Sequence, residues 1–220
     1  MFPLRDVIPS RTTPFVTVAI IALTAVAWFA VISMPREELA EFLRTFGVVP
    51  ADFVTSTLFT SMFLHGSWSH VIGNMWYLWI FGDNVEDRMG HGRFIVFYLL
   101  CGIVAAFGQI IFDPTSTLPT IGASGAIAGV MGAYFVLYPH SRVLTLLPLI
   151  IIWEIVELPA IFLLGFWFLM QLFSAGAISS AVNTAGSGGV AFMAHVAGFV
   201  AGAAGVFVFR KRERPEPWMS

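Results

Sequence analysis

The sequence predicts an all-α membrane protein, a six-transmembrane-helix bundle with both termini in the cytoplasm. The chain of 220 residues is 58% hydrophobic and 11% charged, with a mean hydropathy of +0.85. Soluble domains carry about a quarter charged residues, so the composition indicates an integral membrane protein. Six apolar runs approach or exceed the roughly 20 residues that a helix needs to cross a bilayer. The basic residues are unevenly distributed between the two sides of these runs, which sets the orientation.

The six expected spans are separated by polar segments and turn-forming residues. They cover residues 14–33, 58–82, 93–112, 122–139, 146–174 and 192–209. The second and fifth runs exceed one crossing and are expected to include interfacial ends. The sequence thus predicts one membrane domain over 14–209. A cytoplasmic N-terminal segment (1–13) precedes it and a short basic cytoplasmic tail (210–220) follows it.

The Lys and Arg residues predict the orientation, because cytoplasmic segments carry an excess of them. With the N-terminus inside, the outer segments hold only Arg36 and Arg44, and the inner segments hold the other nine of the 11. Those nine are Arg5, Arg11, Arg88, Arg93, Arg142, Arg210, Lys211, Arg212 and Arg214.

Four polar residues in three spans are expected at one depth, in the outer half of the membrane. At about 1.5 Å per residue, they lie about 27, 21, 27 and 22 Å from the nearest inner Arg, against a hydrocarbon core of about 30 Å. They are His70, Asn74, Ser124 and His195. Polar side chains at such a depth are costly and are usually functional.

A serine and a histidine at one depth suggest nucleophilic catalysis. Neutral imidazole can take the proton of the Ser124 hydroxyl, provided that the fourth and sixth spans touch. Both spans carry small residues that allow close approach, and Gly198 and Gly202 lie on the face of His195. The fourth span contributes Gly122, Gly125, Gly129 and Gly132.

Acyl transfer also needs hydrogen-bond donors for the developing oxyanion. His70 and Asn74 lie one helical turn apart and can both donate, and His65 could join their network. The carboxylates nearest in depth lie in loops or near the inner end of the fifth span, as Asp113, Glu154 and Glu157 do. A Ser–His dyad therefore fits better than a triad.

Simpler interpretations stand beside this one. Ser124 in a small-residue motif and Asn74 on a helix are each compatible with helix packing. His195 taken alone is equally compatible with a structural hydrogen bond. Glu154 and Glu157 are expected to mark the membrane interface. The convergence of four polar residues at one depth favours a catalytic site.

These residues also resemble the signature of the rhomboid intramembrane serine proteases, over nearly the whole chain. The similarity lies in His70-Val71-Ile72-Gly73-Asn74, in Gly122-Ala123-Ser124-Gly125 and in Ala194-His195-Val196-Ala197-Gly198. Residues 82–88 after the second span are similar too. The chain looks like a prokaryotic six-span member, which implies the inner (plasma) membrane.

The resemblance implies a Ser124 nucleophile, a His195 base, and an oxyanion hole formed by His70, Asn74 and the backbone N–H of Ser124. It implies cleavage of transmembrane substrates within the bilayer near their outer end, without cofactor, metal or nucleic acid. Residues 158–173 and the loop 175–191 would form the lateral gate and the cap.

Two departures from the family limit what the resemblance carries over. Some members have an aromatic residue four positions after the serine that stacks on the histidine, whereas this chain has Ala128. The first outer loop (34–57) also lacks the Trp–Arg pair of some members. A catalytically inactive rhomboid-like protein that binds or escorts membrane helices is the main alternative. A metal site or transporter built on His65, His70 and His195 is the other.

Overall fold

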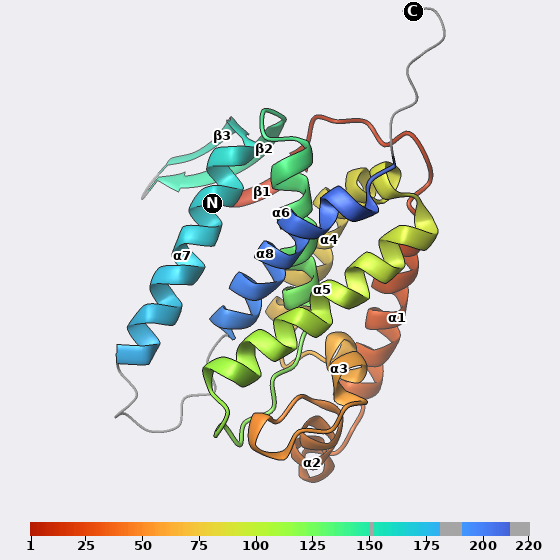
Figure 1. The fold of residues 1–220 in the computed structure, drawn as a ribbon, viewed down its shortest axis with the longest axis vertical. Helices are drawn as coiled ribbons and strands as arrows, with labels where there is room; N and C mark the ends of the chain where they lie inside the picture. Colours follow the sequence, from red (N-terminus) through yellow and green to blue (C-terminus); the bar gives the residue numbers. More distant parts are fainter. Residues whose placement is uncertain (150–151, 181–190, 212–220) are drawn as a thin grey trace, which may run out of the picture.

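The computed structural model describes residues 1–149, 152–180 and 191–211, and within them six long helices form the bundle (Figure 1). They are α1 (Phe15–Ile32), α4 (Trp68–Met89), α5 (His91–Phe112), α6 (Ser124–Leu137), α7 (Ala160–Ser180) and α8 (Phe192–Phe209). Four of them, α1, α5, α7 and α8, are long and apolar enough to cross a membrane. The chain is therefore a mainly helical membrane protein. Six crossings and cytoplasmic termini remain predictions.

Helix α6 is shorter than a membrane crossing and lies at the centre of the bundle. Its 14 residues rise about 21 Å, against about 30 Å of hydrocarbon. All residues from Gly125 to Tyr134 are buried, because α4, α5, α7 and α8 pack around the helix. A helix enclosed in this way does not need to span the bilayer, and its first residue, Ser124, can lie below the membrane surface.

The prediction of an all-α fold is wrong, because the described residues include a three-stranded antiparallel sheet. Its strands, in the order β1-β2-β3, are β1 (Phe2–Asp6), β2 (Arg142–Leu149) and β3 (Ile152–Pro159). The register aligns Phe2 with Leu146 and Leu146 with Ile155. The expected fifth span (146–174) therefore begins as strand, and its helix starts only at Ala160. Short runs of Leu, Ile and Val fit a strand as well as a helix.

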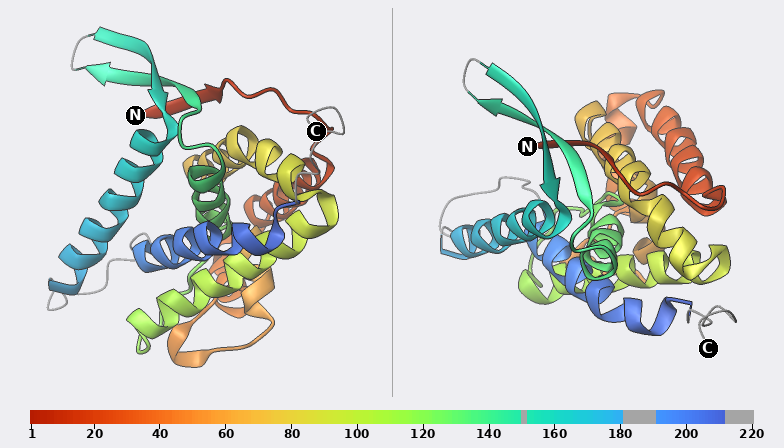
Figure 2. Two further views of the ribbon diagram at one scale, coloured as in Figure 1. Left: turned by 45° about the horizontal axis from the view of Figure 1, so that its top comes forward. Right: turned by 90° about the horizontal axis from the view of Figure 1, so that it is seen from above.

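The sheet packs one face on the bundle, where Val143 and Thr145 are fully buried, and its other face carries the exposed Trp153, Ile155 and Glu157. Glu154 and Glu157, expected at the inner end of a helix, both lie exposed on β3. Glu157 pairs with Arg142 across the hairpin at 3.1 Å. Both views of Figure 2 show the hairpin beyond the N-terminal end of α7, at the edge of the bundle.

The expected second span (58–82) is also wrong in its bounds. Its first part folds as the short α3 (Thr57–Thr60) and a 3-10 turn η2 (Ser61–Phe63), and α4 begins only at Trp68. Ser67 caps α4, since its Oγ accepts from the backbone N–H of His70 at 3.2 Å. The apolar run is continuous in sequence, but this cap interrupts the helix, so that His65 lies before α4.

The expected outer loop (34–57) contains structure that the sequence analysis did not foresee. Helix α2 (Arg36–Phe46) is amphipathic, and η1 (Pro50–Asp52) follows it. The apolar side chains Leu39 and Leu43 of α2 pack on the buried cluster that includes Trp28. Arg44 lies 3.8 Å from Asp52 on the surface.

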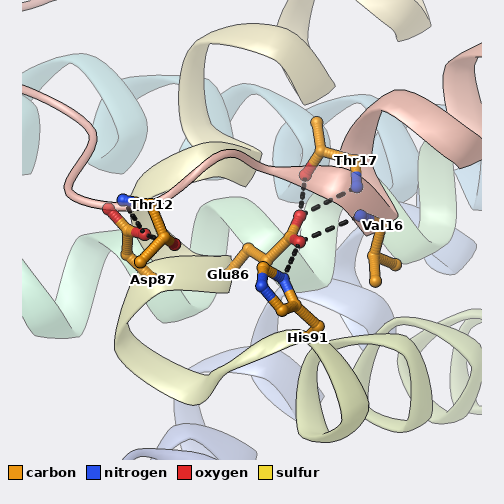
Figure 3. Close-up of polar contacts among 6 residues, drawn as sticks. All are labelled: Thr12, Val16, Thr17, Glu86, Asp87 and His91. Carbon is orange, nitrogen blue, oxygen red and sulfur yellow. Dashed lines mark hydrogen bonds and ion pairs between the residues drawn. The ribbon is translucent and has the colours of Figure 1, made fainter.

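The buried Glu86 carboxylate of α4 holds the start of α1 in place (Figure 3). Glu86 of α4 accepts hydrogen bonds from the backbone N–H groups of Val16 and Thr17 at 2.9 and 2.8 Å. It also accepts from the Thr17 hydroxyl at 2.7 Å, and His91 Nδ1 lies 2.6 Å away. A carboxylate at a helix N-terminus satisfies free N–H groups and complements the helix dipole. Asp87 binds the preceding segment through Thr12.

Candidate active site

Ser124 is the first residue of α6, where backbone N–H groups have no partner within the helix. The turn before it depends on Gly122, whose φ of +121° is one that side chains rarely adopt. A Cβ on Gly122 would also lie 2.7 Å from His70 Nε2. Gly122 therefore allows the His70 imidazole of α4 to pack against the turn that precedes Ser124.

Helices α6 and α8 approach each other through glycines at four-residue spacing. A Cβ on Gly198 would lie 2.1 Å from the carbonyl oxygen of Gly125, and one on Gly202 would lie 1.8 Å from that of Gly129. Gly125 faces α5 as well, where a Cβ would meet the Cβ of Ala105 at 2.5 Å. Only glycine allows this backbone contact, which brings the start of α8 next to the start of α6.

The glycine contact between α6 and α8 brings Ser124 and His195 together. Ser124 Oγ lies 2.8 Å from His195 Nε2, within hydrogen-bond reach of a nucleophile and its base. His195 is buried, with 8% of its surface exposed. With Nε2 unprotonated, the serine hydroxyl donates to it, which is the arrangement needed for removal of the hydroxyl proton.

The other side of the His195 ring contacts α7, and the sequence analysis did not identify these partners. Nδ1 lies 2.8 Å from Oε1 of Gln171, and the ring centroid lies 5.7 Å from that of Trp167. Ala128, at the position where some relatives have a stacking aromatic, is fully buried. An amide in a largely apolar span was the available signal for Gln171.

The second predicted group of polar residues gathers at the N-terminal end of α4. Asn74 Nδ2 donates to His65 Nε2 at 2.8 Å, and the rings of His65 and His70 stack edge to face with centroids 4.8 Å apart. Nδ1 of His65 lies 3.3 Å from the carbonyl oxygen of Phe63. His65 is therefore a fully buried partner of Asn74, whereas His70 is only partly buried.

A cavity of about 810 Å³ joins these two groups. Its lining includes Ser124, His195, His70 and Asn74, and it extends to exposed residues such as Asp113. The cavity therefore reaches the surface at the end of the bundle where α6 begins. It has room for several water molecules next to the serine.

Gln109 of α5 is a further polar residue on this cavity that the sequence analysis did not identify. Its Oε1 is buried and has no hydrogen-bond partner among the described residues. Buried polar atoms usually have a partner, so this oxygen is an exception among the described residues.

In the described part of the chain, no group of three or more His, Cys, Asp or Glu side chains is arranged to hold a metal ion. His65 uses both ring nitrogens in contacts with Asn74 and with the backbone at Phe63. The absence of a metal and of other cofactors remains a prediction. The expected cap loop lies largely outside the described residues, as do Arg212 and Arg214 of the expected basic tail.

Comparison with known proteins shows that the chain is similar to rhomboid proteins. The family model of the Rhomboid domain matches residues 53–212. Rhomboid protein 1, mitochondrial, of Saccharomyces cerevisiae is 30% identical over 125 residues, which are 54% of this chain and 36% of the relative. Rhomboid protease GluP of Bacillus subtilis is 33% identical over 124 residues, which are 54% of this chain and 24% of the relative.

YdcA of Bacillus subtilis is 31% identical over 127 residues, which are 56% of this chain and 62% of the relative. The chain thus matches less than two thirds of the length of each of these relatives. They include bacterial and mitochondrial proteins, so they do not fix the membrane in which this chain resides.

Proposed function

Because the chain belongs to the rhomboid family, we propose that it is an intramembrane serine endopeptidase acting through a Ser124–His195 dyad. The observation that carries this proposal is the 2.8 Å contact between Ser124 Oγ and His195 Nε2 at the base of a cavity that reaches the surface. A serine that served only helix packing would need neither a base nor a cavity.

The acylation step follows from this geometry. His195 Nε2 accepts the Ser124 hydroxyl proton as Oγ bonds to the scissile carbonyl carbon, which gives a tetrahedral oxyanion and an imidazolium. When the intermediate collapses, the C–N bond breaks and Nε2–H protonates the leaving amine. The products of this step are an acyl-enzyme on Ser124 and the free amine fragment of the substrate.

The developing oxyanion needs donors aimed at it before the reaction starts. The backbone N–H of Ser124 at the helix start, the side chain of His70 and the amide of Asn74 are the proposed donors. His65 engages one N–H of the Asn74 amide, which orients the amide and leaves its second N–H free for the oxyanion.

In deacylation, a water molecule is the nucleophile and the Ser124 oxygen is the leaving group. A water molecule in the cavity loses a proton to His195 Nε2 and attacks the acyl carbon, and the Ser124 oxygen leaves with that proton. The opening of the cavity toward the exposed Asp113 supports a water supply from outside the hydrocarbon region.

The proposed substrates are transmembrane proteins cleaved near their outer end, in the plasma membrane of a prokaryote. Six crossings and cytoplasmic termini belong to this proposal. Ser124 then lies on the outer side, because Arg142, expected in the cytoplasm, follows the other end of α6. Since α6 is about 9 Å shorter than the hydrocarbon core, Ser124 lies below the outer membrane surface. A substrate helix would enter laterally past α7, which lies at the edge of the bundle (Figure 2).

The test is cleavage of a transmembrane substrate in proteoliposomes by the wild-type chain and by Ser124→Ala. We expect Ser124→Ala to fold normally and to lose cleavage. The matched control is Ser33→Ala, which removes an exposed hydroxyl at the end of α1 and should leave the rate unchanged. Undiminished cleavage by Ser124→Ala would exclude the mechanism.

Reaction with a fluorophosphonate separates this proposal from the non-catalytic alternative. An activated serine should be labelled in the wild type and not in Ser124→Ala. A wild-type chain that folds but shows no labelling at Ser124 would favour a protein that binds membrane helices without cleaving them.

A further inference from the structure

Helix α7 presents one stripe of side chains to the bundle and the rest to its surroundings. Leu164 is fully buried and Ala175 is nearly so, whereas Phe162, Phe166 and Phe173 are exposed. Positions 164, 167, 168, 171 and 175 share one face of the helix, with helical spacing. Three of these residues touch α8: Trp167 and Gln171 contact His195, and Phe168 stacks on Phe199.

The contact with Gln171 determines what the His195 ring can do. The carbonyl oxygen of an amide only accepts, so Oε1 at 2.8 Å requires a proton on Nδ1. A neutral imidazole with a proton on Nδ1 has a free lone pair on Nε2, the atom that faces Ser124. The same oxygen then stabilises the imidazolium formed when Nε2 takes up the serine proton.

We propose that Gln171 is a positioning residue of the dyad, which holds His195 in the tautomer and orientation that accept the Ser124 proton. This inference rests on the proposed protease function. No carboxylate of the described residues contacts His195, and position 128 is Ala, so Gln171, with Trp167 one turn before it, supplies the orientation. Gln171 acts through His195 and does not touch the substrate.

The position of Gln171 on α7 links the dyad to the edge of the bundle. An outward movement of α7 that admits a substrate helix lengthens the Gln171–His195 contact unless α8 follows. The dyad is therefore fully ordered only when α7 lies against α8. This ties the chemical step to the return of α7 after substrate entry.

The experiment compares Gln171→Leu and Gln171→Glu with the wild type in two assays. Cleavage of a transmembrane substrate depends on entry past α7, whereas labelling by a small fluorophosphonate depends on the dyad alone. For Gln171→Leu we expect both the kcat for cleavage and the labelling rate to fall roughly 10- to 100-fold, with little change in KM. Glu keeps an oxygen acceptor at the same place, so Gln171→Glu should recover most of both rates.

The control is Leu172→Ala, which truncates the next, exposed side chain of α7 and should leave the labelling rate unchanged. A Gln171→Leu chain that cleaves more slowly but is labelled at the wild-type rate would overturn the proposal. Gln171 would then affect the entry of the substrate helix past α7 and not the dyad. Wild-type rates in both assays would overturn the proposal too. In each case the dependence of labelling on Ser124, measured in parallel, shows whether the protease function itself stands.

A spectroscopic measurement on the wild-type chain does not require any Gln171 variant to fold. In a sample labelled with 15N at histidine, with His195→Ala used to assign the signal, we expect the neutral His195 ring to carry its proton on Nδ1. A proton on Nε2 would contradict the proposal. If Gln171→Leu folds, it should populate the Nε2–H tautomer more than the wild type does.

Discussion

The Cα of Gly202 faces the carbonyl oxygen of Gly129 so closely that a Cβ would lie 1.8 Å from that oxygen. The same Cβ would lie 2.4 Å from the carbonyl carbon of Gly129, so no flexible side chain could move aside to relieve the overlap. On the two helices the contact lies five residues after Ser124 and seven residues after His195, roughly one and a half to two turns away. The packing of two backbones therefore sets the distance between the serine and the histidine.

Replacing this glycine should destabilise the chain and misalign the dyad. For Gly202→Ala we expect a loss of about 1–3 kcal/mol or more, because overpacking of a close backbone contact forces the helices apart. Thermal unfolding in detergent measures the loss. The control is Gly92→Ala on α5, where a Cβ meets nothing within 4 Å and the change should stay within about 0.5 kcal/mol. Equal unfolding temperatures for the two variants would contradict this account.

The proposed oxyanion donors should affect turnover more than stability. For Asn74→Ala we expect a fall in kcat of about 100- to 1,000-fold, the range found when one oxyanion donor is removed. His65→Leu should have a smaller effect, because it removes only the hydrogen bond that orients the Asn74 amide. Steady-state cleavage of a transmembrane substrate measures both rates. A larger loss for His65→Leu than for Asn74→Ala, with both chains folded, would argue against these roles.

The Glu86 carboxylate should matter for folding rather than for catalysis. It is fully buried and accepts three hydrogen bonds from Val16 and Thr17. In Glu86→Gln an amide N–H₂ replaces one acceptor and leaves donors at the start of α1 unpaired, at a cost of about 2 kcal/mol. The control is Glu41→Gln on the exposed α2, with almost no cost. Similar unfolding temperatures for the two variants would refute this role of Glu86.

The sequence predicts well those features that depend on local pattern. The spans expected at 14–33, 93–112 and 192–209 correspond to α1, α5 and α8 within two residues at each end, because long apolar runs bounded by turns have few alternatives. The proximity of Ser124 to His195 was also foreseeable. Gly198 and Gly202 mark the close face of α8, and the sequence places both polar residues at one depth.

Features that depend on tertiary packing were not predictable in the same way. Residues 142–159 form a hairpin because β1, far away in sequence, pairs with β2, and an apolar run cannot reveal that partner. Gln171 was missed because its role depends on how α7 rests against α8. The depth estimate for Ser124 assumed one continuous helix to Arg142, whereas α6 ends at Leu137. The 14 helical residues rise about 21 Å, and residues 138–141 complete the segment as turn rather than helix.

A titratable group on the sheet gives a prediction about pH. Asp6 of β1 accepts hydrogen bonds at Oδ2 from the Tyr134 hydroxyl at 2.7 Å and from the Asn84 amide at 3.0 Å. Burial raises the pKa of the Asp6 carboxyl from 3.8 to about 6. The hydrogen bond from Tyr134 opposes this rise, and the nearby Asp83 carboxylate adds to it.

The folded chain therefore holds a proton on Asp6 that the unfolded chain releases between about pH 4 and pH 6. Its contribution to stability is fully present below pH 4 and is lost as the pH rises through 6. In Asp6→Asn a single oxygen can still accept from both Tyr134 and Asn84, but nothing titrates. We expect the unfolding temperature of the wild type, relative to that of Asp6→Asn, to fall as the pH rises from 4 to 7. Parallel curves for the two chains, measured in one detergent, would show that Asp6 does not carry this dependence.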